Sequence, residues 1–285
     1  MICRGVDTVR VAFQGELGAF SEQAVRALVG AEAETLPCHA LRDVFTAVEA
    51  GEAERGVIPV ENSRAGTIRE SYDLLFEFPL RITGEVAVRV EQCLLAPPGQ
   101  TLDRIRRVYS HPQALAQCEA FVRELGAEAI AVYDTAGSAA SLARSPEPGS
   151  AAIASAAAAG IYGLEILAQG IQRDPDNTTR FYVVGPASAA VAPGTGDDRT
   201  VVALALPDDN HPGSLFWCLG TLAFWRVNLL KIESRPSGRR PWHYLFYLEL
   251  AAGAEDPGCR SALAELRTRT SLLRVLGSFP ARPHP

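Results

Sequence analysis

The 285-residue sequence predicts an α/β fold followed by a second, smaller unit of mixed strands and helices. Strand-like and helix-like segments alternate over residues 9–186, the pattern that is typical of α/β proteins. A stretch over residues 187–198, rich in Ala, Pro and Gly, then has the composition of a linker. Beyond it the alternation restarts. We therefore expect two compact parts joined by a linker.

Composition and charge exclude several classes of protein. The hydrophobic content of 47% suits a soluble globular chain with a sizeable core. No apolar run reaches the about 18 residues that span a bilayer, and the first ten residues lack the apolar stretch of a signal peptide. We therefore expect a cytoplasmic protein without a membrane partner. The net charge of −6 argues against nucleic acid as a partner, and the six scattered Cys predict reduced core thiols without metal-ligand spacing.

The first part opens with an expected strand over residues 9–13 and a loop that contains Gly15 and Gly18. The helix that follows is expected to be capped by Ser21. A glycine-rich loop before a helix can bind an anion on its amides, but Glu16 inside this loop is unfavourable for a phosphate. A tight turn and a weak anion site both remain possible.

Further strands of the first part are each followed by small polar side chains. We expect a short strand over residues 56–59, one long strand over residues 82–96 and a strand that ends at Tyr109. The polar groups that follow strands are Ser63 to Thr67, Ser110 to Gln113, Asp134 with Thr135, and residues 177–180. Because ligands collect at the carboxyl ends of strands in open α/β sheets, these groups are expected to line one anion-binding cleft. Helix capping is the alternative for each of them singly, with Ser110 as the expected cap of its helix.

The run from Asn177 to Arg180 has the most distinctive chemistry. It places an amide, two hydroxyls and a guanidinium in sequence just before an apolar strand. An Arg binds a carboxylate through a two-pronged fork, and a Thr hydroxyl can donate or accept a hydrogen bond at a reacting oxygen. A plain turn is the alternative, since Asp, Asn and Pro favour turns.

The second part has a recognisable order of elements. Strands are expected over residues 200–206, 227–233, 242–250 and 272–278, and helices over residues 212–224 and 259–268. This βαββαβ order is that of the ferredoxin-like fold. The segment holds no catalytic constellation, so we expect it to bind a ligand or to dimerise.

With these motifs in view, the chain resembles prephenate dehydratases that carry a C-terminal ACT regulatory domain. The motifs in the first part are Gly15-x-x-Gly18-x-x-Ser21, Pro59-Val-Glu-Asn-Ser63-x-x-Gly66, residues 110–118, residues 134–136 and Asn177-x-Thr-Arg-Phe181. Those in the second part are Pro212-Gly-Ser-Leu215, Asn228-Leu229, Ile232-Glu-Ser-Arg-Pro236 and Leu276-Gly-Ser-Phe-Pro280. The order of these motifs, over roughly residues 8–281, makes the resemblance specific.

The resemblance implies a two-lobed catalytic domain like the type II periplasmic binding proteins, followed by a βαββαβ ACT domain. The boundaries it implies are a catalytic domain over 8–186 (lobe one 8–80 plus 170–186, lobe two 81–169), a linker over 187–198 and an ACT domain over 199–281. It also implies a homodimer or homotetramer. We expect a monofunctional enzyme, because no chorismate mutase segment precedes residue 8.

The reaction implied is the decarboxylative dehydration of prephenate to phenylpyruvate in phenylalanine biosynthesis, a carbon–oxygen lyase reaction without metal or organic cofactor. The catalytic residues implied are Thr179, Arg180, Glu61 and His111. The substrate-binding residues implied are Asn62, Ser63, Ser110, Gln113, Thr135, Asn177 and Phe181. Thr179 is expected to assist the leaving hydroxyl as a hydrogen-bond donor or relay, since a Thr hydroxyl is a very weak acid. For His111 a role in opening its helix is equally expected.

The ACT domain implies L-phenylalanine as an allosteric effector. The effector-binding residues implied are Pro212, Gly213, Ser214, Leu215, Asn228, Leu229, Glu233, Ser234, Arg235 and Pro236. Leu230 stands where the family usually has Thr, which leaves the strength and sign of the regulation open. Two alternatives remain: an arogenate dehydratase, and a non-catalytic amino-acid sensor of the same architecture, which would be expected to have a damaged Thr-Arg-Phe run.

Overall fold

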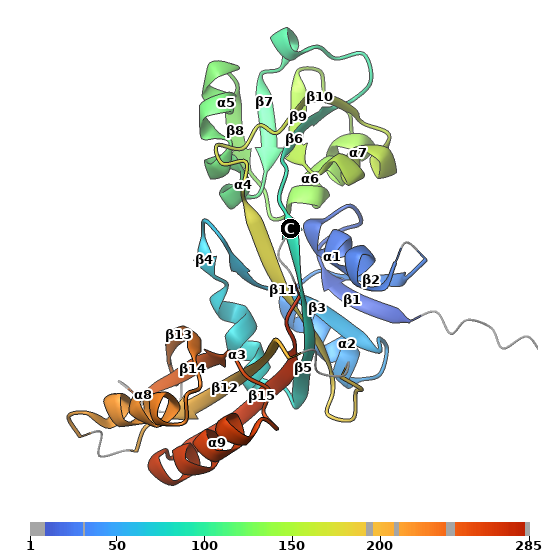
Figure 1. Ribbon diagram of the computed structural model, residues 1–285. Coiled ribbons are helices and arrows are strands. Elements are labelled where there is room, and N and C mark those ends of the chain that lie inside the picture. Colours follow the sequence, from blue (N-terminus) through green and yellow to red (C-terminus); the bar gives the residue numbers. More distant parts are fainter. Residues whose placement is uncertain (1–8, 31, 192–195, 208–210, 238–242, 283–285) are drawn as a thin grey trace, which may run out of the picture. The chain divides into compact units, whose positions relative to one another are not determined.

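The computed structural model describes residues 9–30, 32–191, 196–207, 211–237 and 243–282, which group into two compact units (Figure 1). The first unit holds residues 9–68 and 86–181, and the second holds residues 69–85 and 182–282. Residue 8 and part of the expected linker lie outside the described residues, and the domain boundaries stay a prediction.

The first lobe of the first unit is a sheet covered by two helices. Its elements are β1 (Arg10–Gln14), β2 (Glu34–Cys38), β3 (Arg55–Asn62), β4 (Gly66–Thr67), the first residues of β11 (Thr178–Pro186), α1 (Phe20–Val29) and α2 (Leu41–Glu49). Strand β1 runs parallel to β2 and β3, and β3 lies between β1 and β11. Val11 and Phe13, two residues apart on β1, point into one core together with Ala24 and Val25 of α1. We call this part lobe one.

Lobe two is a five-stranded sheet in the order β10-β6-β9-β7-β8. Its elements are β6 (Cys93–Ala96), a 3₁₀ turn (Leu102–Arg104), β7 (Arg107–Ser110), α4 (Pro112–Gln117), α5 (Glu119–Glu124), β8 (Glu128–Ala131), α6 (Thr135–Arg144), β9 (Ser150–Ala154), α7 (Ala156–Tyr162) and β10 (Glu165–Gln169). On β6, Leu94 packs in the core with α4 and α5, and Leu95 packs in the core with α6 and α7. Both faces of this sheet are therefore buried.

Two chain segments pass between the lobes and hydrogen-bond to each other. The expected single strand over 82–96 is wrong: β5 (Leu80–Arg89) ends before β6 begins. In the gap, the Val90 N–H donates to the carbonyl of Asn177 at 2.7 Å, and the Gln92 N–H donates to Oε1 of Gln172 at 2.9 Å. The break in the strand thus allows the outgoing segment to pair with the returning one.

Two expected helix caps are wrong, and one is confirmed. Helix α1 begins after Ala19 without a side-chain cap, so Ser21 lies inside it. Ser110 is the last residue of β7, and His111 caps α4 instead. Asp134 caps α6, as expected, by accepting a hydrogen bond from the Gly137 N–H at 2.7 Å. Sequence alone identifies cap-forming residue types, but the point where a strand stops decides which one is used.

The loop with Gly15 and Gly18 is a tight turn between the lobes. The Gly18 N–H donates to Oε2 of Glu22 at 2.6 Å, so this amide is occupied. Gly18 has a φ of +85°, and a Cβ there would lie 2.7 Å from Cα of Ala158 in α7. The Ser155 hydroxyl of lobe two also donates to the Gly18 carbonyl at 2.6 Å. Of the two alternatives for this loop, the structure favours the tight turn.

The described cysteines are buried free thiols, as expected. These are Cys38, Cys93, Cys118, Cys218 and Cys259. Burial raises the pKa of the Cys118 thiol to about 12, so it stays protonated at neutral pH. No helix among the described residues is long and apolar enough to cross a membrane.

The second unit has the βαββαβ order that the sequence predicted. Its elements are β12 (Asp198–Ala205), α8 (Ser214–Phe224), β13 (Leu229–Pro236), β14 (Tyr244–Leu250), α9 (Pro257–Arg269) and β15 (Leu272–Pro280), together with α3 (Arg69–Glu77). The sheet order is β13-β14-β12-β15, and the neighbouring strands are antiparallel. Val202 and Leu248 pack against Leu222 of α8 and Leu263 of α9, so these helices share a core with one face of the sheet.

A buried ion cluster holds this unit together. The Arg199 guanidinium lies 2.8 Å from a carboxylate oxygen of Glu249 and 3.4 Å from one of Glu85. Both Glu side chains are almost fully buried, and the Tyr182 hydroxyl donates to Glu249 at 3.2 Å. One guanidinium therefore neutralises part of the charge of two buried carboxylates.

We expect Arg199→Met to lower the free energy of unfolding by about 3 kcal/mol, because it leaves two buried carboxylates without this cation. Urea unfolding followed by circular dichroism measures the loss. The control is Arg10→Met, which breaks the exposed Arg10–Glu34 pair and should cost at most about 1 kcal/mol. Equal losses in the two variants would contradict a special role for the buried cluster.

Candidate functional site

The side chain of Asn62, at the end of β3, organises the polar cluster of the first unit. Its Oδ1 accepts hydrogen bonds from the backbone N–H groups of Arg64 and Ala65, at 3.1 and 3.0 Å. Since a backbone N–H can only donate, these two bonds fix the amide orientation, and Nδ2 must face the other way. There it donates to Oδ1 of Asn177 at 2.8 Å and to Oγ1 of Thr179 at 3.0 Å. The side chain is 4% exposed.

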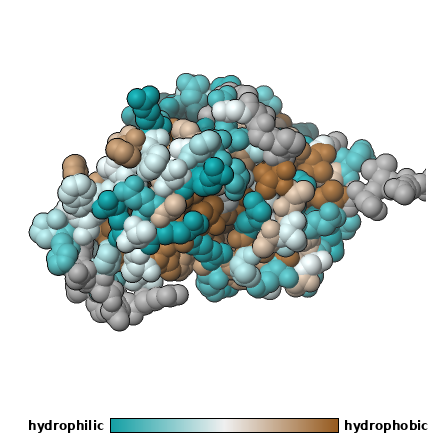
Figure 2. Space-filling view, turned by 60° about the horizontal axis from the view of Figure 1, so that its bottom comes forward, coloured by the Kyte–Doolittle hydropathy of each residue, from teal (hydrophilic) through white to brown (hydrophobic). Residues whose placement is uncertain are grey.

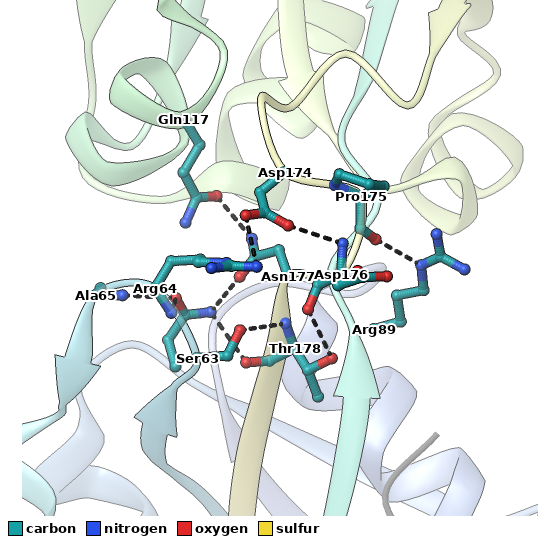
Figure 3. A network of polar contacts seen from close by, with 11 residues as sticks. Ser63, Arg64, Ala65, Arg89, Gln117, Asp174, Pro175, Asp176, Asn177 and Thr178 are labelled. Atoms are coloured by element: carbon teal, nitrogen blue, oxygen red, sulfur yellow. Dashed lines mark hydrogen bonds and ion pairs between the residues drawn. The ribbon is translucent and has the colours of Figure 1, made fainter.

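Asn177 connects this cluster to lobe two. Its Nδ2 donates to Oε1 of Gln117, the last residue of α4, at 3.0 Å (Figure 3). The side chain is 1% exposed, so both of its polar atoms are paired away from water. Figure 3 also shows Ser63, whose Oγ accepts from the Thr178 N–H at 3.0 Å. Asn177 therefore joins β3, β11 and α4 at one point.

Thr179 and Arg180 lie at the start of β11 beside this network. Because Oγ1 of Thr179 accepts a hydrogen bond from Asn62, its own proton is available for donation to a bound molecule. Nη1 of Arg180 lies 3.8 Å from Oε2 of Glu61, and these side chains are 12% and 34% exposed. The cluster thus combines an oriented hydroxyl donor with a mostly buried cation and a nearby carboxylate.

His111 opens helix α4. Its Nδ1 accepts a hydrogen bond from the Gln113 N–H at 3.2 Å, which is the capping role weighed from the sequence. This bond requires an unprotonated Nδ1, so the ring proton of neutral His111 lies on Nε2. A doubly protonated ring would lose the cap. The geometry therefore suits His111 as a hydrogen-bond donor better than as a proton source.

Several predicted residues lie outside the network around Asn62. Phe181 is 1% exposed and packs with Val11 and Phe13 in the core of lobe one. The Ser110 hydroxyl is fully buried and donates to the Ile153 carbonyl at 2.8 Å, so this proton is used inside lobe two. Thr135 is the first residue of α6 and Gln113 an exposed residue of α4. Direct contact of the Phe181 and Ser110 side chains with a substrate receives no support from these positions.

The sequence did not single out Gln117 or the pair of Arg64 and Asp174. Nη2 of Arg64 lies 2.6 Å from Oδ2 of Asp174, which ties the β3–β4 turn to the returning segment (Figure 3). On the other side of that segment, Nε of Arg89 donates to the Pro175 carbonyl at 2.9 Å. Gln117 carries no local signal in the sequence, and only the structure shows its contact with Asn177.

A separate cavity of about 770 Å³ lies between the two lobes. Its wall includes Pro37 and His39 of lobe one and Tyr133 and Asp134 of lobe two. The His39 and Tyr133 rings are stacked, with centroids 4.7 Å apart, and the Tyr133 hydroxyl donates to the His39 carbonyl at 3.0 Å. None of the predicted catalytic residues is among the residues that line it, so this cavity and the polar cluster are distinct features.

The predicted effector residues fall in three places in the second unit. Pro212 to Leu215 line a cavity of about 570 Å³ at the start of α8, together with Phe246. Asn228 and Leu229 line a smaller cavity of about 380 Å³ next to Leu222. The segment from Glu233 to Pro236 forms the end of β13, which is the edge strand next to β14.

Known proteins resemble the whole chain. The family model for prephenate dehydratase matches residues 11–189. An Arabidopsis thaliana protein named "Arogenate dehydratase/prephenate dehydratase 2, chloroplastic" is 43% identical over 95% of this chain and 73% of its own length. The crystal structure of a prephenate dehydratase from Arthrobacter aurescens in complex with L-Phe is 36% identical, with a TM-score of 0.88 over 96% of this chain and 90% of that one.

Another solved structure, described as GqqA, a novel type of quorum quenching acylase, is also 36% identical and reaches a TM-score of 0.88 over 96% of this chain and 98% of its own. The predicted fold class is confirmed: a two-lobed domain like the type II periplasmic binding proteins precedes a βαββαβ ACT domain. On the evidence of the family model and these relatives, the chain belongs to the prephenate dehydratase family.

Proposed function

We propose that the chain is a lyase that converts prephenate to phenylpyruvate, carbon dioxide and water, under allosteric control by L-phenylalanine. The observation that carries the proposal is the Thr179 hydroxyl, which Asn62 holds with its proton available, next to Arg180. An intact Thr-Arg-Phe run, whose Thr179 hydroxyl is held by Asn62, is not expected of a non-catalytic sensor.

The chemistry needs few groups. The carbon–carboxylate bond breaks, its electron pair enters the ring, and the ring becomes aromatic as the carbon–oxygen bond breaks on its other side. The departing oxygen takes up one proton and leaves as water. We assign the hydrogen bond to that oxygen to Thr179 and the binding of a substrate carboxylate to Arg180.

A proton must still enter this site. The weak acidity of a Thr hydroxyl makes Thr179 an oriented donor or a relay rather than the source. We propose the carboxyl group of Glu61 as the proton source, because it lies beside Arg180 in the cluster. In this proposal His111 donates a hydrogen bond from Nε2 to the substrate. Its Nδ1 still accepts the hydrogen bond from the Gln113 N–H that caps helix α4.

Arogenate is the alternative substrate. It carries an amino group where prephenate has a keto oxygen, and the Arabidopsis thaliana relative is named for both reactions. The leaving hydroxyl and the departing carboxylate are the same in both compounds, so the roles of Thr179 and Arg180 would not change.

Regulation by L-phenylalanine is proposed to act through the second unit of a homodimer or homotetramer. The Arthrobacter aurescens structure contains L-Phe, and this chain has cavities beside Pro212 to Leu215 and beside Asn228. Apolar side chains reach the surface in several places on the face that Figure 2 shows. The large exposed ones on α8 and β13 are Phe216, Trp217, Phe224, Leu230 and Ile232. Because Leu230 and Ile232 lie on the edge strand β13 and the other three on α8, we propose that a second copy covers them.

The predicted domain boundaries of 8–186 and 199–281 are part of this proposal, and so is action in the cytoplasm. The Arabidopsis thaliana relative is named as chloroplastic, so the compartment differs among related proteins.

The proposed activity is tested with purified protein, prephenate and arogenate. We expect phenylpyruvate from prephenate, measured by its ultraviolet absorption in alkali, and a lower rate when L-phenylalanine is added. Faster conversion of arogenate to phenylalanine, measured by chromatography, would make arogenate the substrate. If neither compound is converted, the protein is not a dehydratase, and the hypothesis of a non-catalytic amino-acid sensor replaces this proposal.

We expect Thr179→Ala to lower kcat by about 10²–10³-fold with little change in KM, because it removes a hydrogen-bond donor to the leaving oxygen. Steady-state kinetics with prephenate measures kcat and KM separately. Thr179→Ser keeps the hydroxyl and is the matched control, which should retain most of the turnover. A Thr179→Ala variant with normal kcat would remove Thr179 from the mechanism.

We expect Asn62→Asp to lower kcat by about 10²-fold, because a carboxylate cannot donate to Thr179 and instead attracts its proton. The reverse exchange, Asp174→Asn, is the control: it breaks only the ion pair with Arg64. Thermal melting of both variants checks that the fold is intact. Similar kcat values in the two variants would show that the Asn62 amide does not orient Thr179.

A further inference from the structure

Helix α3 packs on the sheet face of the second unit that α8 and α9 leave free. The ring of Tyr72 on α3 meets the ring of Tyr247 on β14 edge to face, with centroids 5.1 Å apart. Nζ of Lys231 on β13 lies 5.4 Å from the centre of the Tyr72 ring. Lys231 and Tyr247 lie on the neighbouring strands β13 and β14, so α3 contacts two strands at once.

The carboxyl end of α3 is held by a third strand. Arg274 of β15 donates from Nη1 to the Phe76 carbonyl and from Nη2 to the Phe78 carbonyl, both at 2.7 Å. A guanidinium at this end satisfies carbonyls that have no partner within the helix. Helix α3 therefore contacts the sheet from Tyr72 to its carboxyl end.

The strongest directional contact joins α3 to the predicted effector segment. Nε of Arg235 donates to Oδ1 of Asp73 at 3.1 Å, and Nη2 of Arg235 pairs with Oδ2 of the same carboxylate. This hydrogen bonding raises the pKa of Arg235. A two-pronged contact fixes the angle between its partners as well as their distance. Movement of the segment from Glu233 to Pro236 must therefore move α3 or break the fork.

Helix α3 is also joined through the chain to the candidate site. It begins at Arg69, directly after Ile68, whose N–H donates to the Val60 carbonyl at 2.9 Å. The two residues before Ile68 form β4, which pairs antiparallel with Glu61 and Asn62. Helix α3 is therefore covalently connected, through Ile68 and β4, to the strand pair that carries the Asn62 amide.

We propose that the fork between Arg235 and Asp73 transmits the effector signal, with α3 as the lever that changes the position of Asn62 and so of Thr179. Asp73 is thus a positioning residue that acts through α3. The proposal rests on the proposed regulation by L-phenylalanine. It requires that the effector favour one of two arrangements of the segment from Glu233 to Pro236.

The test compares Asp73→Asn with wild type in kcat/KM for prephenate, without and with saturating L-phenylalanine. The neutral amide keeps the size of the side chain but weakens the fork. We expect the inhibition, measured as kcat/KM without L-phenylalanine divided by kcat/KM with it, to be at least about fivefold weaker in Asp73→Asn than in wild type. Activity in the absence of L-phenylalanine should be unchanged. Calorimetric titration verifies that L-phenylalanine still saturates the variant, which separates loss of coupling from loss of binding.

Two control variants accompany the test. Glu70→Gln removes a charge from an exposed position of the same helix and should respond like wild type. Asp73→Glu keeps the carboxylate and should restore most of the response. A common melting temperature for all the variants excludes a change in folding, which is expected since Asp73 is 47% exposed.

The outcomes separate this inference from the proposed function. If wild type is not affected by L-phenylalanine, the proposed regulation fails and the inference fails with it. If wild type responds and Asp73→Asn responds equally, the inference alone is overturned. It is also overturned if Asp73→Asn loses activity equally with and without L-phenylalanine, because the fork would then only support the fold.

Discussion

The buried side chain of Asn177 is the constraint on which the site geometry depends. Its amide is shared between Asn62 on β3 and Gln117 on α4, and its own carbonyl receives the N–H of Val90. Because a buried amide without a partner costs about 1–3 kcal/mol, these segments cannot separate independently. Thr179 follows two residues later, so its position is set by the contact of both lobes rather than by a loop.

Much of the polarity that marks the sequence serves the fold. Asp134 caps a helix, the Ser155 hydroxyl binds the Gly18 carbonyl, and His111 closes the first turn of α4. This use leaves few groups for chemistry, chiefly the Thr179 hydroxyl and the pair of Arg180 and Glu61. This small number of groups suits the proposed reaction, in which aromatisation supplies the driving force and the protein mainly orients its substrate.

The fold class was predictable from the sequence because strand and helix periods alternate and then restart after the linker. The polar cluster was predictable in part, since Asn62 and Asn177 stand in recognisable motifs. The break after β5 was not, because its cause is a hydrogen bond to a residue 87 positions away in the sequence, between Val90 and Asn177. The packing of α3 was also hidden: an apolar helix face has the same pattern whichever sheet it covers.

Lysine is almost absent from this chain, and that scarcity has a practical consequence. Lys231 carries the one ε-amino group in the sequence, and it lies over the Tyr72 ring where α3 meets the sheet. A reagent that labels side-chain amines therefore reports on this single contact between Lys231 and Tyr72. Its rate of reaction reports how tightly that helix is seated, without any engineered label.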